Sequence, residues 1–289
     1  MKLIFSAKSS ILAKDKSPIY LRLAGGLGNQ LFQAAAASLV SSNLSRPIVV
    51  STSGLGAYQV RRKPYLKSVI GDTSQLLFTD SCIPAYLNIA LNNFRLGRFC
   101  PMISINDRNI DRVLAGRIVA PLFMDGYFQD FWSWPLLEQA LSQLIVPPVS
   151  SLDSRIQADE VLVHIRGGDF LLNKNFYVAD LAYYRRAVTE TSSLNLKRYA
   201  LISDDNKYAQ YLISRLAECF PSLSFRLISE AGVLEDFDLI RGARYKIIGN
   251  STFAWWASAL SIKSSHTWST ILLTRGRPKK FLLPWETAL

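Results

Sequence analysis

The chain has 289 residues, of which 49% are hydrophobic and 19% charged, and its formal net charge is +11. This length and composition exclude a disordered or fibrous chain and leave room for one large α/β unit or two compact domains. The basic charge favours anionic partners. However, the sequence has no arginine-rich arm and no RNA-binding motif, so nucleic acid is not an expected partner.

Cysteines, histidines and apolar runs indicate the cellular setting. Three cysteines without a C-x-x-C spacing, and only two histidines, argue for a reducing compartment and against a disulfide framework or a zinc site. No apolar stretch reaches the roughly 18 residues of a membrane-spanning helix, and residues 1–12 make a poor secretory signal. We expect a soluble cytoplasmic protein whose basic charge also allows peripheral contact with the anionic inner face of a membrane.

The first predicted elements form a βαβ unit. A strand is predicted over 19–23, a glycine-rich turn follows it, and a helix over 30–40 and a second strand over 47–51 come next. Residues 55–115 carry weaker signals and predict irregular segments or helices.

A predicted domain boundary follows an amphipathic helix that is expected over 136–145. Prolines and serines gather directly after it, at 147–151, and such a stretch is typical of a linker. We therefore predict an N-terminal domain over 1–150 and a C-terminal domain over 151–289.

The second half of the chain alternates clearly between strands and helices. The apolar run 161–165 is typical of a strand buried on both faces of a parallel sheet. The other predicted strands are 199–202, 225–228 and 245–248, and the predicted helices are 183–191 and 208–216. This pattern predicts a second doubly wound domain, so both halves of the α/β chain should be Rossmann-like.

Ligands of open parallel sheets bind at the carboxyl ends of strands, and four loops follow predicted strands here. The first loop, 25–30, supplies Gly26, Gly28, Asn29 and Gln30 as candidates, because glycine lets backbone approach a ligand and a helix N-terminus attracts anions. The loop matches neither the dinucleotide fingerprint nor a P-loop. The alternative is a tight turn into a helix capped by Asn29.

The second loop is His164-Ile165-Arg166-Gly167-Gly168-Asp169. His164 and Arg166 point to the same face of a strand, and the glycines let the chain turn sharply. Arg166 can hold a phosphate with a two-pronged, permanently charged group. Asp169 could orient Arg166, accept a proton from an acceptor as general base, or only cap a turn.

The third loop, 203–205, places Ser203 and Asp204 where acidic residues often bind a ribose or a base. Capping of a helix that starts near Lys207 explains the same residues. The fourth loop contains Asn250, Ser251 and Thr252, and either hydroxyl can cap a helix whose free amides would cradle a diphosphate.

Two further features, a pair of tryptophans and a D-x-D pattern, are interpreted as structural and not as parts of a binding site. Trp255 and Trp256, which follow the fourth loop, are expected to be packing residues. Asp236-Phe237-Asp238 matches the D-x-D pattern of metal-dependent glycosyltransferases. It falls in a predicted helix over 233–241, where the two carboxylates would point about 200° apart, so a solvated helix is favoured over a metal site.

The ordered set of loops resembles the inverting α-1,2-fucosyltransferases, glycosyltransferase family 11. The motifs that carry the resemblance are 26–30, 164–169, 203–205 and 250–256, with 125–129 as a further matching segment. The resemblance extends from about Ile19 to the C-terminus, and residues 1–17 look like an extension.

The resemblance implies a GT-B-like fold, in which two Rossmann-like domains face each other across a cleft. It implies an inverting transfer of L-fucose from GDP-β-L-fucose, held mainly by the C-terminal domain, to the 2-hydroxyl of a galactose-type acceptor. The acceptor would be a glycan or lipid-linked glycan, the setting surface glycan synthesis, and no metal or other cofactor would be needed.

The resemblance also implies roles for individual residues. Arg166 would contact the donor diphosphate, His164 and Asp169 would shape its loop, and Asn29 would reach across the cleft. The other residues expected at the donor are Gly26, Gly28, Gln30, Ser203, Asp204, Asn250, Ser251 and Thr252.

One residue departs from the pattern of the family. Many relatives have a second arginine where this chain has Gly167, so a positive charge near the donor is missing. This departure predicts altered donor affinity or a different arrangement of the acceptor. Apart from it, two alternative functions stay open: a related transferase with another nucleotide sugar or linkage, and a non-catalytic glycan- or polyanion-binding protein of the same fold.

Overall fold

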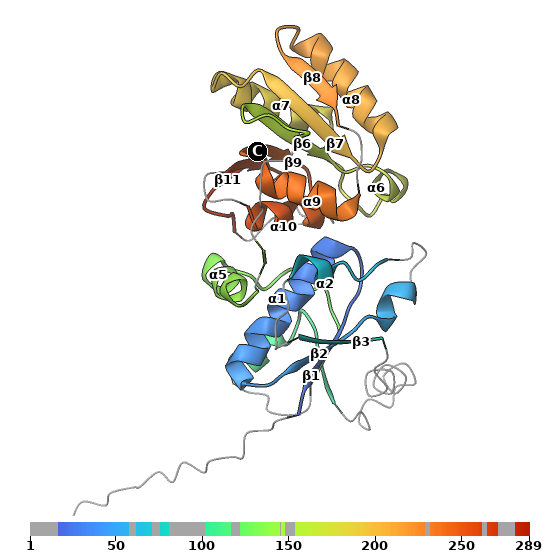
Figure 1. The fold of residues 1–289 in the computed structure, drawn as a ribbon, viewed down its shortest axis with the longest axis vertical. Coiled ribbons are helices and arrows are strands. Elements are labelled where there is room, and N and C mark those ends of the chain that lie inside the picture. Colours follow the sequence, from blue (N-terminus) through green and yellow to red (C-terminus); the bar gives the residue numbers. More distant parts are fainter. Residues whose placement is uncertain are drawn as a thin grey trace, which may run out of the picture.

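The structure is a computed structural model that describes residues 17–57, 62–70, 76–80, 102–116, 122–144, 146–147, 154–228, 232–261, 265–270 and 281–289. These residues form two α/β domains, each built around one parallel sheet, as Figure 1 shows. The two-domain, doubly wound architecture predicted from the sequence is confirmed. The predicted boundary at 150 lies outside the described residues and stays a prediction.

The N-terminal sheet has the strand order β3-β2-β1-β5-β4, and all its pairings are parallel. Its strands are β1 (Ile19–Arg22), β2 (Ile48–Ser51), β3 (Leu76–Thr79), β4 (Ile103–Ile105) and β5 (Leu122–Met124). The chain leaves β1 towards β2 and β3 and returns on the other side of β1, where β5 pairs with it. The strand order therefore switches between β1 and β5, which is where open sheets bind ligands.

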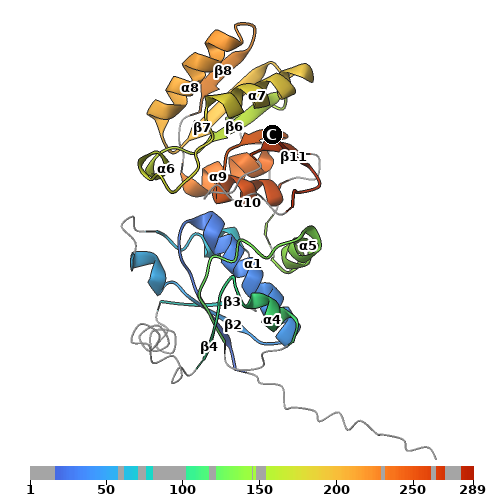
Figure 2. The same ribbon diagram turned by 180° about the vertical axis from the view of Figure 1, so that it is seen from behind.

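Helix α1 (Leu27–Leu44) is the central helix of this domain and is buried over most of its length. It contacts β1, β2, α2 (Leu66–Val69), α4 (Ile110–Leu114), α5 (Trp134–Gln143) and, from the other domain, α10 (Thr252–Ala259). Figure 2 shows α4 and α5 beside α1 on the back of the domain. The run Ala34–Ala37 is fully buried, because small side chains let several elements pack around one helix. A short 3₁₀ helix, Ser53–Ala57, follows β2.

The C-terminal sheet has the order β11-β10-β9-β6-β7-β8, again with parallel pairings only. Its strands are β6 (Glu160–Ile165), β7 (Arg198–Ser203), β8 (Ser224–Leu227), β9 (Tyr245–Ile248), β10 (His266–Ser269) and β11 (Glu286–Ala288). All six residues of β6 are buried, as its apolar run predicted. The order switches between β6 and β9, so the loops after these two strands flank the crevice.

The helices that accompany this sheet in the described part of the domain are α6 (Asp169–Leu172), α7 (Leu181–Ser193), α8 (Asn206–Cys219), α9 (Val233–Gly242) and α10. The predicted helices over 183–191, 208–216 and 233–241 are confirmed as the bodies of α7, α8 and α9. Within the described residues, no helix combines the length and the hydropathy needed to cross a membrane.

Aromatic packing joins the two domains. Phe32 of α1 stacks on Trp255 with ring centroids 5.2 Å apart and meets Trp256 edge-on at 5.1 Å. Both tryptophans are buried, so their predicted packing role is confirmed. Figure 1 shows α10 directly facing α1 across the domain junction. One continuous apolar cluster includes residues from both domains, and burial of this area stabilises their arrangement.

Candidate functional site

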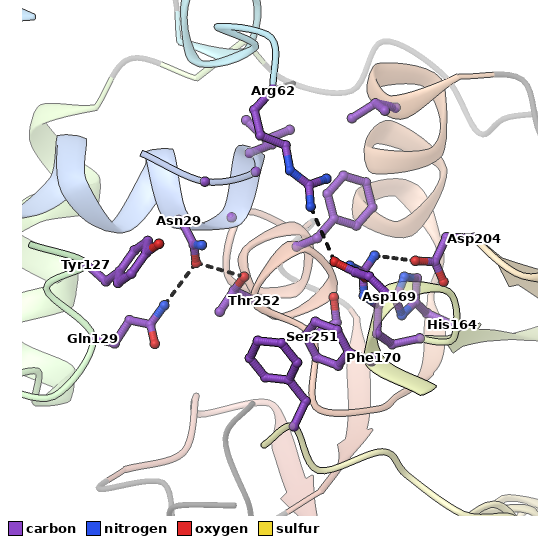
Figure 3. Close-up of a pocket in the computed structure, with 18 of the residues that line it drawn as sticks. Asn29, Arg62, Tyr127, Gln129, His164, Asp169, Phe170, Asp204, Ser251 and Thr252 are labelled. Atoms are coloured by element: carbon purple, nitrogen blue, oxygen red, sulfur yellow. Dashed lines mark hydrogen bonds and ion pairs between the residues drawn. The ribbon is translucent and has the colours of Figure 1, made fainter. Parts of the chain in front are cut away.

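A cavity of about 1280 Å³ lies between the two domains. The loops after β1 and β5 line it from the N-terminal domain, and the loops after β6, β7 and β9 line it from the C-terminal domain. These include both topological switch points, as the rule for open parallel sheets requires. Figure 3 shows the starts of α1 and α10 meeting at this cavity.

The glycine loop after β1 lies where the two domains contact each other. Gly25 has φ = 76° and turns the chain into α1, which begins at Leu27 with Gly26 as its N-cap. A Cβ on Gly28 would lie 2.5 Å from the amide nitrogen of Phe253, so only glycine lets α1 approach α10 this closely. Gly26 and Gly28 both line the cavity, but Gly28 contacts protein backbone there.

Asn29 does not cap the helix, and that alternative is wrong. It lies in the first turn of α1, and its Oδ1 accepts hydrogen bonds from Gln129 Nε2 at 2.9 Å and Thr252 Oγ1 at 3.3 Å. Asn29 thus contacts the other domain at the cavity wall, and Gln129 belongs to the loop after β5 (Figure 3).

Gln30 lies elsewhere than expected. Its side chain is fully buried and is not part of the cavity lining, and its contact with the donor stays a prediction. Its Nε2 donates to the carbonyls of Gly25 and Lys63, at 3.0 and 2.8 Å, and its Oε1 accepts from the Leu66 amide at 3.1 Å. Gln30 therefore fastens the segment around Lys63 to the glycine loop.

Arg166, at the end of β6, is held by two carboxylates. Its Nη2 pairs with Asp169 Oδ1 at 2.5 Å, and its Nη1 pairs with Asp204. The guanidinium carbon also lies 4.5 Å from the ring centroid of Phe170. Asp204 Oδ1 accepts from the Gly167 amide at 2.8 Å, which fixes the loop itself. The guanidinium is therefore pre-positioned at the cavity and remains partly exposed there.

In the acidic loop after β7, the two neighbouring aspartates have different partners. Asp205 caps α8 by accepting a hydrogen bond from the Tyr208 amide at 3.0 Å, whereas Asp204 holds Arg166. Ser203 is buried at the cavity wall, and its Oγ accepts from the Asp205 amide at 3.0 Å. The capping interpretation is confirmed for Asp205, and contact of Ser203 and Asp204 with a ribose or a base stays a prediction.

His164 lies on β6 at the back of the cavity and is 7% exposed. Burial lowers its pKa to about 4, with Arg166 acting in the same direction and Asp204 opposing it. The imidazole is therefore neutral at pH 7 and adds no positive charge for an anionic ligand. Within the part of the chain that the structure describes, its Nδ1 has no hydrogen-bond partner.

The loop after β9 forms the start of α10. Ser251 Oγ caps this helix by accepting from the Ala254 amide at 3.4 Å, and Thr252 binds Asn29. Asn250 is buried, donates through Nδ2 to the Tyr177 carbonyl, and is not part of the cavity lining. Asn250 therefore shapes the loop, and its contact with the donor stays a prediction.

Gly167, where the chain departs from the family pattern, is closely covered. A Cβ at this position would lie 2.7 Å from the Cβ of Asp205. A larger residue here would require the start of α8 to shift.

The D-x-D pattern lies in α9, as predicted, and its carboxylates bind different arginines. Asp236 pairs with Arg155 at 2.8 Å, and Asp238 pairs with Arg241 at 2.6 Å. Asp236 is mostly covered, with 15% of its side chain exposed, so the helix is less solvated than expected. Across the described ranges, no group of three or more histidine, cysteine or acidic residues is arranged to hold a metal ion.

Among the residues of the cavity wall that the sequence did not identify as candidates are Arg62, Gln129 and Phe170. Gln129 lies in the segment 125–129, whose resemblance to the family was the sequence signal that could have identified it. Arg62 belongs to a short basic cluster, but only its fold places it opposite Arg166.

Two Rossmann-like domains that face each other across a cavity define the GT-B type of fold. The family model described as glycosyl transferase family 11 matches residues 123–274. This match covers more than half of the chain, and the chain belongs to glycosyl transferase family 11.

Individual relatives agree with this assignment. An alpha-1,2-colitosyltransferase from Escherichia coli is 25% identical over 267 residues, which cover 84% of this chain and 88% of the relative. The NodZ alpha-1,6-fucosyltransferase structure, soaked with GDP-fucose, superposes with a TM-score of 0.56 and 14% identity over 85% of this chain and 93% of its own; NodZ is from Bradyrhizobium. A GDP complex of a FUT1 variant from Arabidopsis thaliana superposes with a TM-score of 0.51 and 14% identity over 91% of this chain and 71% of its own. At these identities the two structures show the shared fold.

Proposed function

We propose that this glycosyltransferase moves L-fucose from GDP-β-L-fucose to the 2-hydroxyl of a galactose-type acceptor, with inversion at the anomeric carbon. The observation that carries the proposal is the fixed guanidinium of Arg166 at the switch point of the C-terminal sheet, beside the N-terminus of α10. Both groups favour a diphosphate, because arginine binds phosphate in two-pronged fashion and helix N-termini carry free amides. The acceptor is a glycan or lipid-linked glycan of surface glycan synthesis.

The chemistry is a single displacement. The acceptor hydroxyl attacks the anomeric carbon from the face opposite the diphosphate, the bond between the anomeric carbon and the phosphate oxygen breaks with its electron pair staying on GDP, and the acceptor proton is released to water. The transition state has oxocarbenium character, as in glycosidases. Negative charge grows on the leaving GDP, so Arg166 and the Ser251–Thr252 start of α10 are the groups that lower the barrier.

Asp169 serves in this proposal to hold Arg166. Both of its carboxylate oxygens are paired with guanidinium groups, Oδ1 with Arg166 at 2.5 Å and Oδ2 with Arg62 at 3.4 Å. A carboxylate that is engaged on both sides is poorly suited to accept the acceptor proton. We therefore assign it to positioning and not to general base catalysis.

A second donor deserves the same test, because the Escherichia coli relative is named for transfer of colitose. Colitose lacks one hydroxyl of fucose, and the diphosphate site proposed here would accept either nucleotide sugar. Contacts to the sugar ring decide between them.

The test is incubation of the protein with GDP-fucose, GDP-colitose, GDP-mannose and UDP-sugars, each with a panel of galactose-terminated acceptors, followed by linkage analysis. The proposal predicts transfer from GDP-fucose and an α-1,2-linked product. Arg166→Ala should lower turnover by about 10²–10³-fold, whereas Arg185→Ala, an exposed arginine on α7, should leave it unchanged. Transfer from a UDP-sugar only, or GDP binding without transfer, would contradict it.

A further inference from the structure

Asp169 is shared by two arginines that come from opposite domains. Arg166 Nη2 meets Asp169 Oδ1 at 2.5 Å, and Arg62 Nη2 meets Asp169 Oδ2 at 3.4 Å. All three side chains line the cavity, and Figure 3 shows Arg62 pointing down from the N-terminal domain towards Asp169. One anionic group thus already bridges the two guanidinium groups across the cavity.

The segment that carries Arg62 is anchored on both sides of the residue. The Arg62 amide donates to the Leu55 carbonyl at 3.2 Å, and the next carbonyl, that of Lys63, accepts from the buried Gln30 at 2.8 Å. The Leu66 amide is also bound to Gln30, at 3.1 Å. These three hydrogen bonds hold the backbone around Arg62 in place, so the side chain of Arg62 extends into the cavity from a fixed position.

The charges around the cavity explain why placement matters. Among the described residues, the lining contains five cationic side chains and five carboxylates: Arg62, Lys63, Arg108, Arg166 and Lys174, and Asp107, Asp130, Asp169, Asp204 and Asp236. The described cations and carboxylates of the lining are equal in number, so individual groups must attract a diphosphate there. Two carboxylates engage Arg166, whereas Arg62 has the longer, weaker pairing with one of them. Of the two arginines on Asp169, Arg62 is the one whose transfer to an incoming anion disturbs the resting arrangement less.

We propose that Arg62 binds the diphosphate of the nucleotide sugar together with Arg166, so that the donor is held by one arginine from each domain. This inference rests on the proposed function, because it needs a nucleoside diphosphate in the cavity. A diphosphate offers more oxygens than the carboxylate of Asp169 and can take one guanidinium at each end. Asp169 stays on Arg166 and keeps it in place.

The test compares Arg62→Gln with Lys67→Gln in direct titrations with GDP and with guanosine. Lys67 is exposed on α2, lies outside the cavity lining and loses the same charge, so it is the matched control. Loss of a charge-assisted contact should weaken GDP binding about tenfold or more for Arg62→Gln. Guanosine binding, and GDP binding by Lys67→Gln, should match wild type. The GDP affinity of Arg62→Lys should lie between those of wild type and Arg62→Gln, because lysine keeps the positive charge but lacks the two-pronged guanidinium group.

A second comparison separates direct contact from an effect through Asp169. If Arg62 only holds Asp169, its substitution should have no further effect in an Asp169→Asn chain; if it binds the diphosphate, the loss should persist there. Equal GDP affinity of Arg62→Gln and wild type, or a loss that disappears in Asp169→Asn, would overturn the inference. Failure of the wild type to bind GDP would instead contradict the proposed function. Thermal unfolding without ligand checks that each variant is folded.

Discussion

Gly28 of α1 lies so close to Phe253 of α10 that a Cβ on the glycine would be 2.5 Å from the Phe253 amide nitrogen. This contact sets how closely the two domains meet beside the cavity. Gly28→Ala should therefore lower the free energy of unfolding by about 1–3 kcal/mol, the usual cost of overpacking, and should weaken binding of GDP-fucose. Chemical denaturation and titration of the same preparation measure both effects.

Gly56→Ala is the matched control for this change. A Cβ on Gly56 would meet no atom within 4 Å, and the residue is exposed. Its stability should stay within about 0.5 kcal/mol of wild type. Equal behaviour of the two alanine variants would mean that the domains do not meet as described.

Gln30 supports the glycine loop and the segment that carries Arg62. Gln30→Ala leaves the Gly25 and Lys63 carbonyls and the Leu66 amide without this partner, and each buried unsatisfied group costs about 1–3 kcal/mol. We expect a clear fall in the thermal midpoint. Gln139→Ala, an exposed glutamine on α5, should leave the midpoint unchanged. A tolerant Gln30→Ala chain would argue against the structural role given to this side chain.

Lys246 gives the fold a specific pH dependence. It is fully buried on β9, its Nζ donates to the Ala243 carbonyl at 2.7 Å, and burial lowers its pKa to about 7. The unfolded chain binds this proton up to about pH 10, so between about pH 7 and 10 the unfolded state holds more protons than the folded state. Stability should therefore rise with pH in this window, by up to about 1.4 kcal/mol per pH unit from this group.

Lys246→Met removes the titrating group and keeps its bulk. Denaturation in urea at pH 7, 8.5 and 10 should show a flatter pH dependence for Lys246→Met than for wild type, with the largest gain in stability at pH 7. Lys67→Met, at an exposed position, should follow the wild-type curve. If the pH dependence of Lys246→Met were the same as that of wild type, the pKa of Lys246 would not be lowered in the folded protein.

Sugar transfer should not depend on a divalent metal. Asp236 and Asp238 of the D-x-D pattern are each committed to a different arginine, Arg155 and Arg241. We expect the same turnover in EDTA and in added Mn²⁺, measured as release of GDP in the presence of an acceptor. Strong stimulation by Mn²⁺ that Asp236→Asn abolishes would reverse this interpretation.

The strand ends could be predicted from the sequence, because an apolar run such as 161–165 identifies a buried strand and places Arg166 at its end. The sequence could not predict which side chains face the cavity. Asn29 and Gln30 are adjacent in α1, yet one faces the cavity and the other packs inside, since neighbours on a helix point about 100° apart. Where the helix begins decides between them, and it begins at Leu27, three residues before the predicted start at 30.

Other parts depend on contacts between distant segments. Strand β10, His266–Ser269, is too polar to read as buried, yet Ser269 binds Glu286 at 2.5 Å and Thr267 meets Ser258 at 2.6 Å. These partners satisfy its polar groups inside the fold. Arg62 likewise acquires its place through Gln30, 32 residues away in the sequence, and no local pattern reveals that.

The central claim is that the cavity holds a nucleotide sugar through Arg166, and calorimetric titration with GDP-fucose tests it most directly. Wild type should bind GDP-fucose, and Arg166→Ala, if folded by thermal unfolding, should bind it at least about tenfold more weakly because a charge-assisted, two-pronged contact is lost. Equal affinity of the two proteins, or no binding by wild type, would contradict the account.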